Sequence, residues 1–458
     1  MTITKYFSWS QIFRLGLVQM SIGGVVVLTT STLNRIMVVE LLLPALIPGI
    51  LVALHYAVQL IRPRMGFGSD ISGKCTPWII GGMAILSLGG LLSTFATTIM
   101  FSSPSTGIVL AILGFLAIGI GVSAAGTALL TLLAKKVDEK KRAMAATIVW
   151  LMMIGGFALT AGISGQFLDP FSNEKLLTIA SVVSITSFFL TFFALWNLEG
   201  KENKSELDYD KSRGIDIEGD SVKNKFFEVL KEIWNEKTSK QFTIFVFISM
   251  FAFSMQDLIL EPFAGIVFEM SPGQTTSLSG IQHSGVLIGM IIVALLSTHN
   301  GFSKNLISLK NWIIGGCILS SLALFGIVLG GINGMGWPIK FNVFVLGIAN
   351  GSFSIAAIAG MMQLAKEGKS KREGIRIGLW GASQAIAFGL GGLIGALLSD
   401  IARFLISNVG VAYSFVFLIE SALFLLAANV AKTIKFRKTH NSGIDQKKEV
   451  IISSSGSI

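Results

Sequence analysis

The chain consists of apolar runs of about twenty residues, which short polar connections separate. A bilayer core about 30 Å thick requires about 20 apolar residues in a crossing helix. Because lipid offers no hydrogen-bond partners, the backbone N–H and C=O groups of a single crossing segment must bond one another, as they do in a helix. We therefore predict an all-α integral membrane protein. It should have twelve transmembrane helices, over residues 15–33, 41–61, 78–100, 107–134, 143–168, 176–195, 242–260, 276–297, 312–332, 341–365, 374–398 and 410–431.

The charged residues support a membrane class. Only 14% of the 458 residues are charged, whereas about a quarter would be usual for a soluble domain. The net charge of +10 arises from Lys and Arg in the short connections, which is typical of membrane proteins and disfavours nucleic-acid binding. Two cysteines give no disulfide framework and no CxxC metal motif. The first apolar run lacks a small-residue cleavage site, so we expect a first span and not a signal peptide.

The distribution of basic residues predicts the orientation. Connections after even-numbered spans are rich in Lys and Arg, and connections after odd-numbered spans contain few. Because cytoplasmic loops carry the excess of basic residues, we expect both termini in the cytoplasm. The even-numbered connections hold Arg62, Arg64, Lys74, Lys135, Lys136, Lys140, Lys141, Arg142, Lys304, Lys310, Lys366, Lys369, Lys371, Arg372 and Arg376.

A long polar connection divides the chain into four predicted parts. These are a six-helix half at 1–196, a cytoplasmic linker at 197–240, a second six-helix half at 241–431 and a cytoplasmic tail at 432–458. Within the linker, Phe226, Leu230 and Ile233 recur at helical spacing, which predicts an amphipathic helix on the membrane surface. The alternative is a helix that packs on neighbouring loops.

The two halves are repeats of one another. The motif WIIGG occurs at 78–82 and again at 312–316, and the pair Gly-Phe occurs at 66–67 and at 301–302. At nearly the same separation, Ala-Lys recurs at 134–135 and 365–366, and Trp150 matches Trp380. Internal repeats of this kind are characteristic of secondary-transporter folds. We therefore expect two pseudo-repeated six-helix halves.

One loop resembles a known signature. Gly66-x-x-x-Asp70-x-x-Gly73-Lys74 is similar to the loop between spans 2 and 3 of the major facilitator superfamily, although the second half has Asn305 in place of the Asp. Glycines permit tight turns, and the Asp can cap a helix end or pair with a basic group. The resemblance implies the major facilitator fold, which serves many cargoes.

A narrower resemblance covers nearly all twelve spans. RLGLVQMSIGG at 14–24, NRIMVVEL at 34–41, LVALHYAVQLIRPRMGFGSD at 51–70 and GLWGASQAIAFGLGG at 378–392 resemble the bacteriochlorophyll-delivery (PucC/LhaA-like) family. The resemblance implies a membrane assembly factor that binds chlorophyll or bacteriochlorophyll and delivers it to light-harvesting or antenna proteins. It also implies a cytoplasmic, intracytoplasmic or thylakoid membrane of a photosynthetic bacterium, with lipid as a further partner. The Ile, Lys and Asn content favours a cyanobacterial-type member.

Two histidines are candidates for binding such a pigment. A chlorophyll magnesium takes one axial ligand, and a neutral imidazole in an apolar site suits it. His55 lies within the second span, at a depth that Trp150 and Trp380 share, so the three form one candidate site. The alternative is that His55 bonds a neighbouring helix and the two indoles only pack. His283 lies two helical turns from the position that corresponds to His55, so it marks a second candidate site at another depth.

Four charged residues form a candidate outer gate. Arg35 and Glu40 follow the first span, and Asp257 and Glu261 lie at the end of the seventh. A carboxylate near hydrocarbon is costly unless it is paired, and we expect Arg35 as the partner of Asp257 by depth. Such a pair would hold the two halves closed on the outer side. The alternative is a proton-linked gate.

Two functions therefore remain open. The first is the pigment-binding assembly factor, and the second is an ion-coupled secondary transporter of a small solute. We do not expect an enzyme, because the sequence has no P-loop, no dinucleotide fingerprint and no nucleophile–base set. It also lacks the Asp-rich diphosphate–Mg²⁺ site that a chlorophyll synthase would need.

Overall fold

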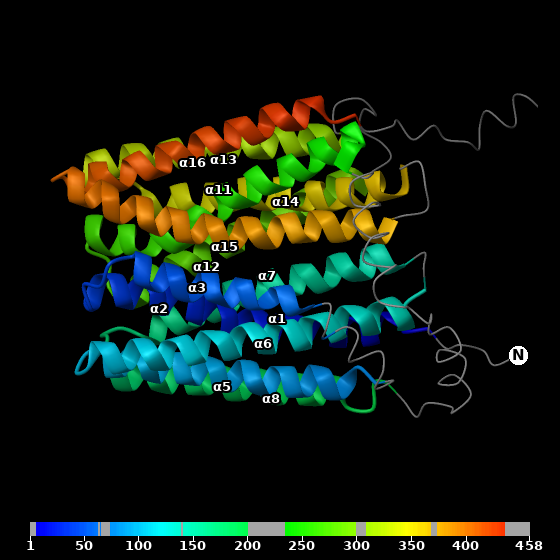
Figure 1. Ribbon diagram of the computed structural model, residues 1–458, viewed down its shortest axis with the longest axis horizontal. Coiled ribbons are helices and arrows are strands. Elements are labelled where there is room, and N and C mark those ends of the chain that lie inside the picture. Colours follow the sequence, from blue (N-terminus) through cyan, green and yellow to red (C-terminus); the bar gives the residue numbers. More distant parts are fainter. Residues whose placement is uncertain are drawn as a thin grey trace, which may run out of the picture.

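A computed structural model of the protein describes residues 6–62, 65, 74–138, 141–199, 234–298, 308–367 and 373–435. Every regular element in these ranges is a helix, and the helices lie side by side along one common direction (Figure 1). In chain order they are α1 (Trp9–Val27), η1 (Leu28–Thr32), α2 (Leu33–Arg35), η2 (Ile36–Glu40), α3 (Leu46–Val58), η3 (Gln59–Ile61), α5 (Thr76–Met100), α6 (Pro104–Lys136), α7 (Arg142–Phe167), α8 (Asn173–Leu195), α11 (Lys237–Val267), α12 (Pro272–Thr298), α13 (Leu309–Asn333), η4 (Gly334–Gly336), α14 (Ile339–Glu367), α15 (Glu373–Leu405) and α16 (Val409–Thr433).

The predicted fold class is confirmed. Among the described residues, eleven helices are long and apolar enough to cross a membrane. The shorter apolar helix Leu46–Ile61 provides the twelfth crossing element. The first crossing helix, Trp9–Glu40, is continuous through α1, η1, α2 and η2, and its two η segments are π-helical turns.

Several helices extend further than their apolar runs predicted. α11 begins at Lys237 and continues past Asp257 and Glu261 to Val267. The first crossing helix likewise continues past Arg35 to Glu40. The prediction ended these spans at charged residues, but the charged side chains contact protein groups in the helix bundle, so the helix does not have to stop there.

Local sequence explains where the helices begin. Pro77 and Pro104 occupy the first turns of α5 and α6, where a missing N–H costs no hydrogen bond. Ser172, Ser308 and Asn408 precede α8, α13 and α16, and each side chain accepts a hydrogen bond from a backbone N–H of the first turn.

The helices pack as two sets. In the first set, α5 contacts α6 and α8, α1 contacts α7 and α8, and α3 contacts α6. In the second, α13 contacts α14 and α16, α11 contacts α15 and α16, and α12 contacts α14. α5 and α6 approach so closely that a Cβ on Gly121 would lie 2.5 Å from the backbone nitrogen of Leu86. We call these sets the first half (α1–α8) and the second half (α11–α16); they lie on opposite sides of the bundle in Figure 1.

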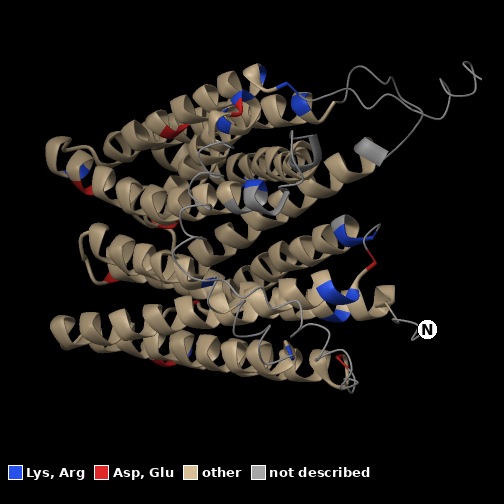
Figure 2. Ribbon diagram, turned by 45° about the vertical axis from the view of Figure 1, so that its right-hand side comes forward, with Lys and Arg blue, Asp and Glu red and all other residues tan. Residues whose placement is uncertain are grey.

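The bundle has a basic end. Most of the described Lys and Arg residues gather at one end of the helices (Figure 2). Both ends of the described chain lie there, because the Phe7 backbone N–H bonds the Lys136 carbonyl and the Lys310 ammonium bonds the Ile434 carbonyl. We call this the basic end; that it faces the cytoplasm stays a prediction. The proposed linker before residue 234, the tail beyond residue 435, and Gly66, Asp70 and Gly73 of the signature loop lie outside the described residues.

Candidate functional site

The candidate site lies where the two halves meet. Two helix pairs cross this interface, α7 with α12 and α3 with α15. The first crossing helix also contacts α11, through η1, α2 and η2. Small residues allow the close approach: a Cβ on Gly280 would lie 2.6 Å from the Gly162 nitrogen. Residues far apart in the sequence are therefore brought together along this interface.

Polar side chains bridge the two halves toward the end of the bundle opposite the basic end. Ser31, in the π-helical turn η1, donates a hydrogen bond to the carboxylate of Glu261 on α11. The hydroxyl oxygens of Ser31 and Ser279 lie 3.3 Å apart, and those of Thr32 and Thr276 lie 3.1 Å apart. π-helical turns within α-helices are frequent at functional sites.

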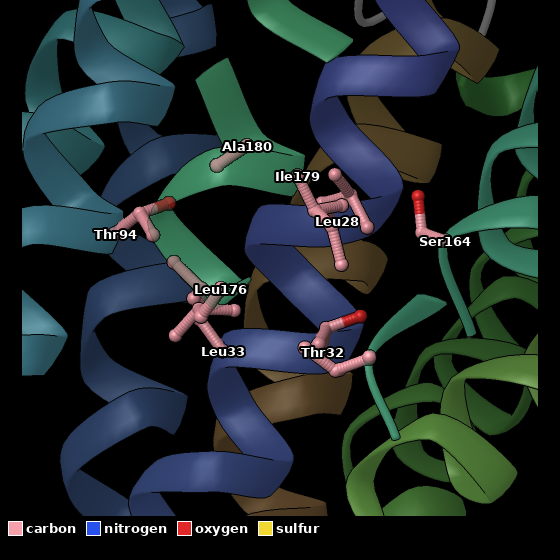
Figure 3. A pocket seen from close by; sticks show the side chains of 9 residues that line it. Leu28, Thr32, Leu33, Thr94, Ser164, Leu176, Ile179 and Ala180 are labelled. Atoms are coloured by element: carbon pink, nitrogen blue, oxygen red, sulfur yellow. The ribbon is translucent and has the colours of Figure 1, made fainter. Parts of the chain in front are cut away.

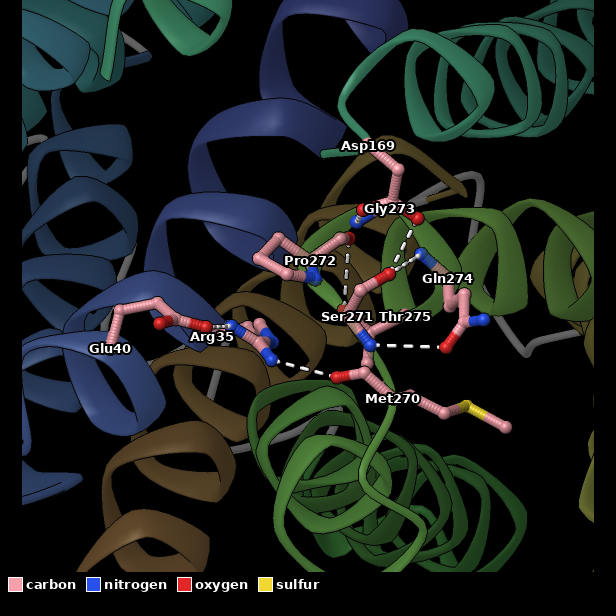
Figure 4. Close-up of polar contacts among 9 residues, drawn as sticks. All are labelled: Arg35, Glu40, Asp169, Met270, Ser271, Pro272, Gly273, Gln274 and Thr275. Carbon is pink, nitrogen blue, oxygen red and sulfur yellow. Dashed lines mark hydrogen bonds and ion pairs between the residues drawn. The ribbon is translucent and has the colours of Figure 1, made fainter. Parts of the chain in front are cut away.

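The ion pair of Arg35 differs from the expected one. Arg35 is buried and pairs with Glu40, five residues later, where the π-helical turn η2 brings the two side chains onto one face (Figure 4). Its other terminal nitrogen donates to the Met270 carbonyl of the second half at 2.8 Å. The expected pairing with Asp257 is therefore wrong. Arg35 still links the halves, but through a backbone carbonyl.

The carboxyl groups of Asp257 and Glu420, in the second half, lie near this polar bridge but have no described ion-pair partner. Asp257 is half-buried on α11, close enough to Glu261 and Glu420 for electrostatic interaction. Glu420 of α16 is fully buried, and neither of its carboxyl oxygens has a hydrogen-bond partner among the described residues. The side-chain amide of buried Gln256 likewise has no described partner. Unpartnered buried polar groups are uncommon, so Glu420 and Gln256 belong to the candidate site, and half-buried Asp257 joins them through its electrostatic interaction with Glu420.

His55 is held within its own helix. It is 1% exposed, and its Nε2 lies 3.0 Å from the side-chain nitrogen of Gln59, one turn later. Because the Gln59 oxygen accepts a hydrogen bond from Arg62, its amide nitrogen donates to His55. The Nε2 lone pair of His55 is therefore occupied in this arrangement.

In His283, unlike His55, the hydrogen bond is made by Nδ1 and leaves Nε2 without a described partner. Its ring faces Phe157 of α7 across the interface, with ring centroids 5.0 Å apart. Its Nδ1 donates a hydrogen bond to the Ser279 carbonyl at 2.9 Å, which assigns the lone pair to Nε2. No described residue bonds this Nε2, so the half-buried imidazole keeps a free ligand atom.

The two tryptophans do not meet His55 in any described contact. Trp380 is 1% exposed and packs edge-on against Phe242 of α11 within the second half, with centroids 4.8 Å apart. Trp150 is half-buried on α7. Of the signature loop, Lys74 is described and exposed. Beside it, Glu199 accepts hydrogen bonds from the Cys75 and Thr76 backbone at 2.7 and 2.8 Å, so a carboxylate caps α5.

A small cavity lies beside the interface, between α7, α8 and the first crossing helix (Figure 3). Leu28, Thr32 and Ser164 are among its lining residues, and its volume is about 10 Å³. That volume admits about one water molecule. A ring as large as a chlorophyll does not fit this cavity.

Sequence reasoning missed four residues of this region. Glu420 is the one carboxylate in the apolar run 410–431, and that isolation was a usable signal. Ser31 carried no signal, because a serine in an apolar helix is common. Asp169 and Asp400 lie at span ends, where charge is ordinary, so only the structure shows that each carboxylate accepts hydrogen bonds from backbone N–H groups of the other half.

The chain is similar to a family of proteins and to curated bacterial relatives. The family described as PUCC protein matches residues 32–439. The "Bacteriochlorophyll synthase 44.5 kDa chain" of Rhodobacter capsulatus is 46% identical over 424 residues, which cover 92% of this chain and 95% of that protein. "Protein PucC" of Cereibacter sphaeroides is 27% identical over 436 residues, covering 91% and 90%.

Solved transporters share the fold. A D-xylose–proton symporter superposes with a TM-score of 0.68 at 12% identity, covering 93% of this chain and 97% of that one. A structure of proton-dependent oligopeptide transporters gives 0.66 at 14% identity, covering 93% and 98%. These likenesses establish the major facilitator fold and nothing about cargo. The chain belongs to the PUCC protein family, and it adopts a twelve-helix major facilitator fold.

Proposed function

We propose that the protein is a membrane assembly factor that binds chlorophyll or bacteriochlorophyll and delivers it to light-harvesting or antenna proteins. Membership of the PUCC protein family connects the chain with photosynthetic complexes. The pigment is the cargo, and the client is a membrane protein of a photosynthetic bacterium. The role is not enzymatic, although the relative from Rhodobacter capsulatus carries the word synthase in its name.

One observation carries the proposal. The His283 imidazole lies at the interface, its Nδ1–H is held by the Ser279 carbonyl, and its Nε2 has no described partner. A hydrogen bond on one ring nitrogen fixes the tautomer and increases the basicity of the other, which is how proteins prepare a histidine for a metal. The geometry therefore favours His283 over His55 as the magnesium ligand. Ligation by His55 would first require it to release Gln59.

The packing around His283 suits an apolar ring. Phe157 faces it edge-on, and a Cβ on Gly155, five residues after Trp150 on the same helix, would meet no other side chain or backbone within 4 Å. Because aromatic rings stack readily on a tetrapyrrole, these residues of α7 supply the apolar wall. Ring entry requires α7 and α12 to separate toward the basic end.

The absorption spectrum tests the proposal. The protein is purified in mild detergent from a pigment-producing host, and the visible spectrum is recorded against a preparation of an unrelated membrane protein from the same host. We expect tetrapyrrole bands at about one pigment per protein. A preparation without any bound tetrapyrrole, from cells that contain the pigment, would refute pigment delivery by direct binding.

A second function is supported by a different observation. The carboxyl groups of Asp257, Glu261 and Glu420 lie near one another inside the bundle, and such groups in transporters bind protons or cations. This arrangement favours an ion-coupled transporter of a small solute. In proteoliposomes, a substrate-dependent proton influx that Glu420→Gln abolishes would support this function over pigment delivery.

A further inference from the structure

Two aspartates occupy equivalent places in the two halves. Asp169 follows α7 and Asp400 lies near the end of α15, with the same separation along the chain as the repeated lysines Lys135 and Lys366. Each carboxylate reaches across the interface to the beginning of a helix in the other half. Both lie at the end of the bundle opposite the basic end.

Asp400 binds the start of α3. Its two carboxylate oxygens accept hydrogen bonds from the Ala45 and Leu46 backbone N–H groups, each at 2.9 Å. The first N–H groups of a helix have no acceptor within the helix. Asp400, from the second half, therefore supplies a cap that the residues before α3 do not provide.

Asp169 binds the start of α12 in the same manner. One oxygen accepts from the Gly273 backbone N–H at 3.1 Å, and the other accepts from the Ser271 hydroxyl at 2.5 Å (Figure 4). A Cβ on Gly273 would lie 2.5 Å from the Asp169 carboxyl carbon, so glycine is needed at this approach. Ser271 and Gln274 also cap α12 from within, so the contact of Asp169 is additional.

These contacts favour a closed interface at this end. A carboxylate at a helix N-terminus interacts favourably with the helix dipole, and charged acceptors form stronger hydrogen bonds than neutral ones. Separation of the halves breaks both caps at once, because each joins a helix of one half to a helix of the other. The Arg35–Met270 contact adds a third link at the same end.

We propose that Asp169 and Asp400 form a paired lock, which holds the two halves together at the end opposite the basic end. Opening at that end requires the release of both caps, whereas the basic end can open while both remain formed. The repeat thus provides each half with the carboxylate that the other half needs. This inference goes beyond the proposed function and holds for any cargo.

Distances between spin labels test the lock. Labels are attached to Ser102→Cys, after α5, and Ser407→Cys, after α15, which are exposed positions at the locked end on different halves. The buried native thiols are removed as Cys75→Ala and Cys317→Ala. Pulsed electron resonance in lipid nanodiscs then compares the parent with Asp169→Asn, Asp400→Asn and the double variant.

We expect each single change to raise the long-distance population relative to the short one by about fivefold, and the double change to raise it by about the product of the two. Glu174→Gln is the matched control, since Glu174 is exposed in the first turn of α8 and has no described contact with the other half. It should leave the distances unchanged.

An unchanged distance distribution in the monodisperse double variant would overturn the proposal. An equal increase of the long-distance population in Glu174→Gln would also overturn the proposal, because loss of a surface charge would then explain the change without any loss of a cap. If the Asn variants are not monodisperse, Asp169→Ala and Asp400→Ala provide the same measurement, because alanine offers the N–H groups of α12 and α3 no acceptor.

Discussion

The side-chain amide of Asn34 donates a hydrogen bond of 2.6 Å to the backbone carbonyl of Leu258, across the interface between the halves. The acceptor is free because Pro262, four residues later in α11, has no N–H to bond it. A proline in one half thus creates the binding partner for an asparagine in the other. Both groups are buried, so neither has water as a replacement.

Replacement of Asn34 by Leu should therefore destabilise the protein. The change leaves the Leu258 carbonyl buried and unpartnered, which costs about 1–3 kcal/mol. We expect a lower midpoint of thermal unfolding in detergent, measured by intrinsic fluorescence at matched detergent concentration.

The control for this prediction is Pro262→Ala. The alanine N–H can bond the Leu258 carbonyl within α11, so Asn34 is no longer needed there. Asn34→Leu should cost less stability in the Pro262→Ala background than in the parent. Equal losses in both backgrounds would mean that the two residues are not coupled.

Arg35 and Glu40 should be coupled, and Arg35 and Asp257 should not. Arg35 pairs with Glu40, and Glu40 is about a third exposed, so solvent screens part of the interaction. A double-mutant cycle with Arg35→Met and Glu40→Gln should give a coupling of about 1–2 kcal/mol in unfolding free energy. In the same cycle with Asp257→Asn in place of Glu40→Gln, the two losses of unfolding free energy should be additive. A coupling energy there would support the Arg35–Asp257 pair that the sequence predicted.

The fold was predictable because it rests on coarse features. Runs of about twenty apolar residues and the repeated WIIGG motif are visible without any contact information, and they led to twelve helices in two related halves. Helix ends were less predictable. α11 continues past Glu261, because Ser31 of the other half donates a hydrogen bond to this carboxylate within the bundle.

The site was only partly predictable. Composition identified His55 and His283, but their hydrogen bonds depend on neighbours four residues away that adopt one of several rotamers. The partner of Arg35 depends on the π-helical turn η2, which places Glu40 beside it and which apolar periodicity does not reveal. Contacts between the halves, such as that of Asp400 with Leu46, follow from packing alone.

Reporter fusions should establish the orientation. Fusions at Ser205 and Ser453 should both read cytoplasmic, and a fusion at Ser103 should read external, because basic connections stay on the cytoplasmic side. Paired alkaline phosphatase and green fluorescent protein fusions measure this at each position. A translocated Ser205 fusion would contradict the twelve-helix topology with cytoplasmic termini.

His283→Leu should remove bound pigment while the protein stays folded. Leucine keeps an apolar side chain next to Phe157 but cannot ligate magnesium, and loss of a ligand should reduce affinity by at least about tenfold. The pigment-to-protein ratio after purification from a pigment-producing host measures the loss. Antenna assembly in cells should decrease with it.

His55→Leu is the matched control, because it also removes an imidazole from a helix of the interface. It breaks the hydrogen bond with Gln59, so we expect a lower thermal midpoint but a pigment ratio close to that of the parent. The reverse result, with pigment lost in His55→Leu and retained in His283→Leu, would assign the ligand to His55. Gln59 would then have to rotate away from the imidazole to expose Nε2, and Gln59→Leu should increase the bound pigment.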